Sequence, residues 1–225
     1  MMTLYTAIGT YKLGNRGLPT IVSGNKEYGL VPCELLLWSD LAFRILTYKE
    51  LKEKFYMHMM ELDIPDEMEF DHCLHRLMMR GLVVSGKDCT GADALYNLLG
   101  HLHVQPVPDG WPEKVLSFMK LTLCKKLPWK KAIGVFHKEK LEPVEKQILT
   151  LVKNQTLSTA ELIRCTEKGK TSLKDNEELM ECLYPEEDDD CEKIVTEGRF
   201  SEIRYVILSA VANLYMKQRI VFQLV

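Results

Sequence analysis

The sequence lacks the long apolar run, about 18–20 residues, that a membrane-spanning helix requires. Its first residues, Met1–Tyr5, contain no basic group followed by an apolar stretch, so no secretory signal is expected. Aromatic side chains make up only 8% of the chain, but 46% of the residues are hydrophobic, which is ordinary for a packed globular protein. These features predict a cytoplasmic protein without a membrane span.

No two cysteines have the CxxC spacing of a zinc knuckle. The seven cysteines are an odd number and are scattered over the whole chain: Cys33, Cys73, Cys89, Cys124, Cys165, Cys182 and Cys191. A disulfide framework or a structural zinc site needs clustered cysteines. We therefore expect free thiols in a reducing compartment.

Catalytic signatures are also missing, because the chain has no Gly-x-Ser-x-Gly elbow, Walker loop or GxGxxG turn. His72 and His75 share one helical face and are the candidate metal ligands, with Asp71 or Cys73 as a further ligand. No HxxxH or HExxH spacing accompanies them, and histidines half exposed on an ordinary helix are the alternative. We predict a protein that is not an enzyme and has no cofactor or metal.

An internal repeat organises the chain. Pro32–Trp38 matches Pro143–Leu149 in the opening proline and in the glutamate two residues later. At the same spacing of 111 residues, Leu46–Leu51 matches Leu157–Leu162, and both read Leu-[Ser/Thr]-x-x-Glu-Leu. This motif is typical of a capping box, in which the hydroxyl and the glutamate satisfy first-turn amides. Each copy predicts a helix opened by proline, a short turn and a second, capped helix.

A third matched pair lies at a different spacing. Leu77–Val84 aligns with Leu214–Val221, 137 residues later, and both join a basic helix end to a short β-branched run. The longer spacing indicates an insertion of 26 residues between the second and third helices of the second copy. Expected strands at Pro19–Val22 and Ala132–Phe136 complete the order strand, helix, helix, helix, strand.

This order resembles that of tandem winged helix-turn-helix proteins, over roughly residues 18–100 and 132–225. The resemblance implies a mainly α protein with short strands, an α+β fold, made of two winged-helix-like domains joined by a basic helix. The first domain is expected over 1–108, with an extra C-terminal helix, and the connector over 109–131. The second is expected over 132–225, with an acidic insertion at about 168–199.

The two copies differ at their C-terminal ends. In the first, Ser85–Gly91 is rich in turn-forming residues and predicts a wing, and Ala92–Leu99 predicts a helix capped by Thr90. The second stops at Val225, a few residues into its last strand. That strand is expected to pair with another part of the chain or with a partner chain, so a homodimer is one possibility.

Residues 112–140 are strongly basic, with eight lysines against two glutamates and Trp111 and Trp129 nearby. Such a segment can neutralise phosphates, and an aromatic ring beside it can stack on a base. Two other interpretations stay open. The segment can be an interdomain helix whose lysines are simply solvated, or a helix lying on an anionic membrane surface.

Residues 175–197 are strongly acidic, with eleven carboxylates against Lys193. A run of like charges repels itself and predicts an extended or mobile loop. The run lacks the Asp-x-Asp-x-Asp-Gly spacing of a calcium loop. A further alternative is that it folds back over the basic segment and masks it.

The third helix of a winged helix normally enters the DNA major groove. In the first copy this helix is expected over Asp66–Arg80, where four acidic residues outnumber Arg76 and Arg80. In the second copy Ser201–Arg219 is dominated by apolar residues, which is typical of a core or interface helix. Both observations count against conventional groove binding.

The resemblance nevertheless implies nucleic-acid binding, and we predict a DNA-binding transcriptional regulator. The candidate contacts are two arginines of the third helix and five lysines: Arg76, Arg80, Lys87, Lys125, Lys126, Lys130 and Lys131. The alternative is a protein–protein module, since the kleisin-binding subunits of bacterial chromosome-condensing complexes are similar in charge and element order. Its contact surface would then be the apolar third helix of the second copy and the terminal strand.

Overall fold

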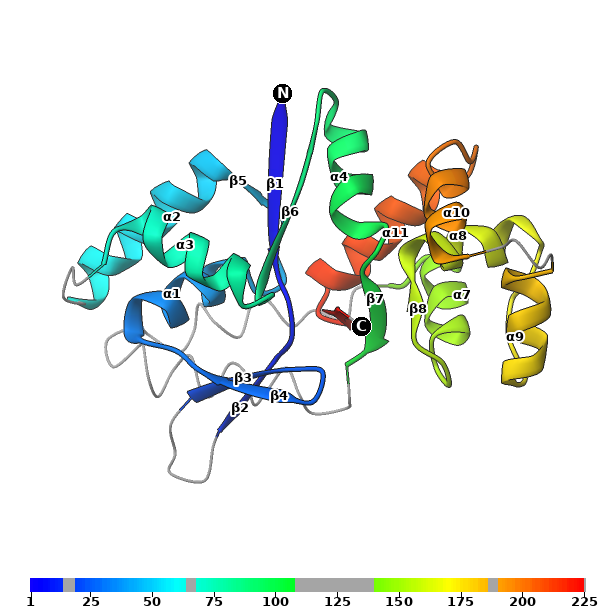
Figure 1. Cartoon of the computed structure of the whole chain (residues 1–225), viewed down its shortest axis with the longest axis horizontal. Helices are drawn as coiled ribbons and strands as arrows, with labels where there is room; N and C mark the ends of the chain where they lie inside the picture. Colours follow the sequence, from blue (N-terminus) through cyan, green and yellow to red (C-terminus); the bar gives the residue numbers. More distant parts are fainter. Residues whose placement is uncertain (14–18, 64–67, 108–139, 186–189, 225) are drawn as a thin grey trace.

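The computed structural model describes residues 1–13, 19–63, 68–107, 140–185 and 190–224 (Figure 1). Within these residues helices predominate, and the strands form small antiparallel sheets of three strands each. The predicted α+β class is confirmed.

The first unit is built on a sheet whose central strand is β1 (Met2–Ala7). This strand pairs antiparallel with β5 (Leu46–Thr47) on one side and with β6 (Val83–Asp88) on the other. The helices of this unit are α1 (Pro32–Leu41), α2 (Tyr48–Leu62) and α3 (Phe70–Met79). They pack against the sheet around a core that includes Phe55 and Phe70, both fully buried.

The second unit repeats this arrangement around β7 (His103–Pro106). This strand pairs antiparallel with β8 (Leu157–Ser158) and with β9 (Ile220–Gln223). The helices of the second unit are α7 (Pro143–Leu151), α8 (Thr159–Glu167), α9 (Asn176–Leu183), α10 (Cys191–Gly198) and α11 (Arg204–Met216). Figure 1 shows these helices on one side of the molecule and α1, α2 and α3 on the other.

The registers of the two sheets correspond. In the first sheet Tyr5 of β1 lies opposite both Leu46 and Ser85. Leu157 lies 111 positions after Leu46, and Phe222 lies 137 positions after Ser85. Both of them lie opposite Val104 of β7. The spacings found in the sequence therefore relate residues with the same pairing in the two units.

The first strand of the first unit is not the one predicted. Pro19–Val22 lies in β3 (Pro19–Ser23), the middle strand of a separate antiparallel sheet with β2 (Thr10–Leu13) and β4 (Lys26–Gly29). The predicted strand Ala132–Phe136 falls outside the described residues. Since β7 already belongs to the second sheet, the domain boundary predicted at 108 falls after that unit's first strand. A short β-branched run indicates a strand but not the sheet that it joins.

The helix starts predicted from the repeated motifs are confirmed. Both α1 and α7 begin at a proline, and α2 and α8 follow Thr47 and Ser158. The Glu50 amide donates to Thr47 Oγ1 (3.4 Å), and the Glu161 amide donates to Ser158 Oγ (3.2 Å). Each glutamate accepts a hydrogen bond from the amide of its cap in return, so both capping boxes are complete.

Much of the acidic insertion is helical rather than an extended loop. Helices α9 and α10 begin after Asp175 and Asp190, whose carboxylates accept hydrogen bonds from first-turn amides. Helix α9 buries Leu183 and α10 buries Ile194 in the core of the second unit. The expectation of a mobile loop is therefore wrong for these two helices, because their apolar sides give them a face to bury. Residues 186–189 of the run lie outside the described part of the chain.

The core of the second unit extends into the first, because it includes Ile8 and Phe43. Helix α4 (Gly91–Leu99) begins after Thr90, the predicted cap, whose hydroxyl accepts from the Asp93 amide (3.1 Å). Its Tyr96 is buried with side chains of α8 and α11. From α11, the Tyr215 hydroxyl donates to the Ala7 carbonyl at the end of β1 (3.2 Å). The first unit is therefore packed directly on the second.

The partner surface predicted on the second unit is mostly interior. Most of α11 is buried, and its exposed large apolar side chains are Tyr205, Val206 and Met216. Strand β9 pairs with β7, and the Phe222 carbonyl accepts a hydrogen bond from the Gly9 amide (3.1 Å). Of the two pairings expected for this strand, the one within the chain is confirmed.

Candidate interaction surface

The first unit holds a buried carboxylate between two arginines. Glu34, in the first turn of α1, is fully buried. Its Oε1 lies 2.7 Å from Nε of Arg76 in α3, and its Oε2 lies 3.2 Å from a guanidinium nitrogen of Arg80, which caps the C-terminus of α3. The Val31 amide also donates to Glu34 Oε2 (3.3 Å). One side chain therefore joins the start of α1 to the end of α3.

The second unit contains the equivalent ion pair. Glu145 of α7 is also fully buried, and Nζ of Lys217, at the end of α11, lies 2.8 and 3.0 Å from its two carboxylate oxygens. These residues are the counterparts of Glu34 and Arg80 at the repeat spacings of 111 and 137. The glutamate two residues after each proline was visible in the sequence. The sequence did not reveal that Arg80 and Lys217 would pair with these glutamates. The two residues of each pair are 46 and 72 positions apart, and no local rule connects them.

Two of the predicted nucleic-acid contacts come together in the structure, but at a carboxylate. Arg76 and Arg80 meet at Glu34, with 36% and 31% of their side chains exposed. Lys87 is exposed on β6. The remaining candidates lie outside the described residues: Lys125, Lys126, Lys130 and Lys131.

The solvent side of α3 has no lysine or arginine besides Arg76. Its exposed side chains are Asp71, His72, His75, Met78 and Met79. The Tyr48 hydroxyl of α2 donates to Asp71 Oδ1 (2.6 Å), which holds this carboxylate at the start of α3. A helix face of this composition attracts phosphates weakly, because phosphate binding depends on lysine and arginine.

The candidate metal ligands are spread over two sides of α3. His72 and His75 are exposed, whereas Cys73 is buried. Burial, together with a hydrogen bond to Cys33, raises the pKa of the Cys73 thiol to about 12. A protonated thiol is a poor metal ligand. In the ranges that the structure describes, no three histidine, cysteine or carboxylate side chains form a group that could hold a metal ion.

Helix α2 presents apolar side chains to solvent. Tyr56, Met57 and Met60 are adjacent on its outer side and are 40%, 44% and 78% exposed. These three residues are called the α2 stripe below. The opposite side of α2 carries Leu51 and Phe55, both fully buried. The outer side of a surface helix is normally polar, so three neighbouring exposed apolar side chains are unusual there.

A histidine–aspartate pair ties α2 to α1 beside the α2 stripe. His58 Nδ1 lies 2.6 Å from Asp40 Oδ1, and the Asp40 side chain is only 4% exposed. The hydrogen bond to Asp40 raises the pKa of His58 above its usual value, against the opposing effect of partial burial. Among the smaller charge effects, Glu61 raises this pKa and Lys54 lowers it.

The contribution of this pair to stability is expected to fall with rising pH. The folded state binds the His58 proton more tightly than the unfolded chain does, so the stabilisation is complete below about pH 6.5 and is lost as the pH rises through the raised pKa. Urea unfolding of the wild type and of His58→Gln at about pH 5.5 and about pH 8.5 measures this. The difference between the two proteins should shrink at the higher pH, and a constant difference would contradict the assignment.

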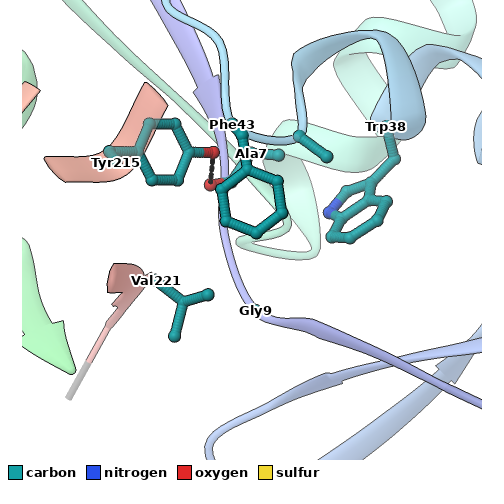
Figure 2. Close-up of a pocket in the computed structure, with 7 residues that line it drawn as sticks. Ala7, Gly9, Trp38, Phe43, Tyr215 and Val221 are labelled. Atoms are coloured by element: carbon teal, nitrogen blue, oxygen red, sulfur yellow. Dashed lines mark hydrogen bonds between the residues drawn. The ribbon is translucent and has the colours of Figure 1, made fainter. Parts of the chain in front are cut away.

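The junction between the units leaves little space for a ligand. Figure 2 shows a pocket lined by Phe43, Trp38 and Tyr215, with the Tyr215 hydroxyl bonded to the Ala7 carbonyl. Phe43 has a φ of 58°, a region that is costly for a bulky residue, and its ring lies 5.3 Å from that of Tyr215. The cavity is about 10 Å³, which is at the limit for one water molecule. This pocket therefore does not accommodate an organic ligand.

Comparison with known proteins finds no family model, curated protein or solved structure that matches this chain. Among the described helices, none combines the length and the apolar character needed to cross a bilayer.

Proposed function

We propose that this chain is a non-enzymatic interaction module, made of two winged-helix-like units, that binds a protein partner through the first unit. The matched order of strands and helices in the two units, with matched registers, supports the winged-helix-like part of the proposal. The α2 stripe is the contact surface in this proposal, because its three apolar side chains are adjacent and exposed on the outer side of one helix.

The observation that carries the proposal is the pairing of both α3 arginines with Glu34. A DNA-reading third helix needs cations that are free to meet phosphates and base edges. Here Arg76 and Arg80 are both held at one buried carboxylate instead, so both guanidinium groups are committed to a contact within the unit. The outer side of α3 is left with Asp71, two histidines and two methionines.

Nucleic-acid binding in transcriptional regulation is the second candidate, and one observation favours it. Residues 112–140 have a net charge of +6, and they include Lys125, Lys126, Lys130 and Lys131. A segment of this charge can bind the phosphate backbone without base recognition.

A salt titration with a short generic DNA duplex separates the two candidates. As a protein-binding module, the chain is expected to show no saturable DNA binding even at low salt. The variant Lys125/Lys126/Lys130/Lys131→Ala should behave as the wild type does in a fluorescence anisotropy measurement. The proposal is wrong if the wild type binds with an affinity that falls steeply with salt and the variant flattens that dependence.

A further inference from the structure

We propose that the α2 stripe is the contact surface for a second copy of this chain, whose α2 packs antiparallel to the first across a two-fold axis. The inference rests on the proposed function, because it names the partner of the same surface. It also replaces the terminal strand and α11 as the basis for a homodimer, since both are covered within the chain.

The position of α2 leaves room for a partner. Figure 1 shows α2 at the outer end of the first unit, on the side away from the second unit. Met60 is 78% exposed and Met57 is 44% exposed, so a facing helix would remove mostly apolar area from water. Methionine side chains are flexible and adapt to the surface that they meet.

Tyr56 gives this surface a rigid anchor. Its ring is 5.5 Å from that of Phe55 and 6.4 Å from that of Phe70, both of which belong to the buried core. The ring is nevertheless 40% exposed. A half-exposed tyrosine that is already held in place loses little conformational entropy on binding, which is typical of an interface hot spot.

Charge selects the partner and its direction. Lys54 and Glu61 lie on the same edge of α2, two helical turns apart. Along the helix axis, Lys54 comes before Met57 and Glu61 comes after it. Neither has an ion-pair partner among the described residues. An axis next to Met57 brings Lys54 of each copy opposite Glu61 of the other. Such a two-fold contact is self-complementary, as a symmetric dimer requires.

The remaining charges of the helix are compatible with this pairing. Glu53 lies within the exposed side of α2, but Lys49 pairs with it in the same helix at 3.9 Å. Asp63, which ends α2, and Lys52 occupy the other edge, where Lys52 lies 3.6 Å from Asp71 of α3. A parallel arrangement would place each charged residue beside the same residue of the other chain, and these like charges would repel each other.

The interface is small, so the dimer is expected to be weak. Helix α2 has 15 residues and is about 22 Å long, and one helix per copy buries less area than a stable complex normally does. We expect a dissociation constant on the order of 10–100 µM, which is the range of transient contacts.

Sedimentation equilibrium of the full chain over about two decades of concentration tests the inference. The average mass should rise from that of one 26.0 kDa chain towards twice that value. Met60→Glu should weaken self-association about tenfold or more, because it puts a carboxylate in the apolar contact. Met180→Glu is the matched control, since Met180 is 54% exposed on α9, and it should leave the mass profile unchanged.

A charge exchange tests the antiparallel direction. Lys54→Glu and Glu61→Lys should each weaken the dimer, because each places like charges together across the axis. The double variant Lys54→Glu/Glu61→Lys should restore it. Single variants without effect, or a double variant that stays monomeric, would overturn the inference.

A photo-cross-linking side chain at position 60 distinguishes this failure from failure of the proposed function. A cross-linked species of two identical chains supports the inference. A monomeric chain that cross-links to a protein of another mass overturns the inference but leaves the proposed function standing. A monomeric chain without any protein adduct overturns both.

Discussion

Replacing Arg76 and Arg80 together by methionine is expected to lower the free energy of unfolding by about 3–5 kcal/mol, the usual cost of leaving a buried charge without its partner. Glu34 is fully buried, so its carboxylate cannot turn into water when both guanidinium groups are removed. Methionine keeps much of the side-chain length, so the loss of packing is small. Chemical unfolding followed by circular dichroism measures the change.

The control for this prediction removes the negative charge of Glu34 as well. Adding Glu34→Gln to the double variant is expected to recover a large part of the loss, because a neutral amide costs less to bury than a carboxylate. Lys87→Met, at an exposed position, should change stability by less than about 0.5 kcal/mol. A double variant as stable as the wild type would show that the two arginines are not needed inside the unit. Their role as phosphate contacts would then be open again.

Gly86→Ala is expected to destabilise the protein by about 3 kcal/mol, because β6 passes directly beneath α4 at this residue. A Cβ at position 86 would lie 2.6 Å from Cα of Leu98, and closer still to the Leu98 nitrogen and the Ala94 carbonyl oxygen. These are backbone atoms, so the helix must shift as a whole, which a close-packed interior resists. Thermal unfolding should move down by roughly 6–12 °C for a chain of this size.

The effect should extend beyond the first unit, because α4 also contributes to the core that joins the two units. Hydrogen exchange in α11 and β9 is therefore expected to become faster in Gly86→Ala. Gly29→Ala is the matched control, since a Cβ at position 29 has no neighbour within 4 Å. If the two alanine variants were equally stable, the close approach of β6 and α4 would be wrong.

The two arginines of the third helix have a partner that a count of charges does not reveal. The sequence showed two arginines and four carboxylates over Asp66–Arg80, a count that went against groove binding, and only the winged-helix resemblance made the arginines candidate nucleic-acid contacts. The structure pairs them with Glu34, which lies in another helix. Charge on a segment therefore predicted neither how much of that charge reaches the surface nor which partner it meets.

The net charge of the acidic insertion was also a poor guide to its structure. Its net charge predicted an extended run, yet α9 and α10 form because each has an aspartate cap and an apolar side that reaches the second core. The decision to bury Leu183 and Ile194 depended on a neighbouring helix that local patterns do not reveal.

The sequence by itself determined where α1, α2, α7 and α8 begin and that two segments of the chain share one order of elements. A proline at the first position and a capping box both act within a single helical turn, so a few neighbouring residues are enough to predict their effect. Only the tertiary structure decided which strand opens each unit, which cation meets each buried glutamate and which side of α2 stays exposed. Those outcomes depend on contacts between residues tens of positions apart, and a short sequence pattern does not show how strong such contacts are.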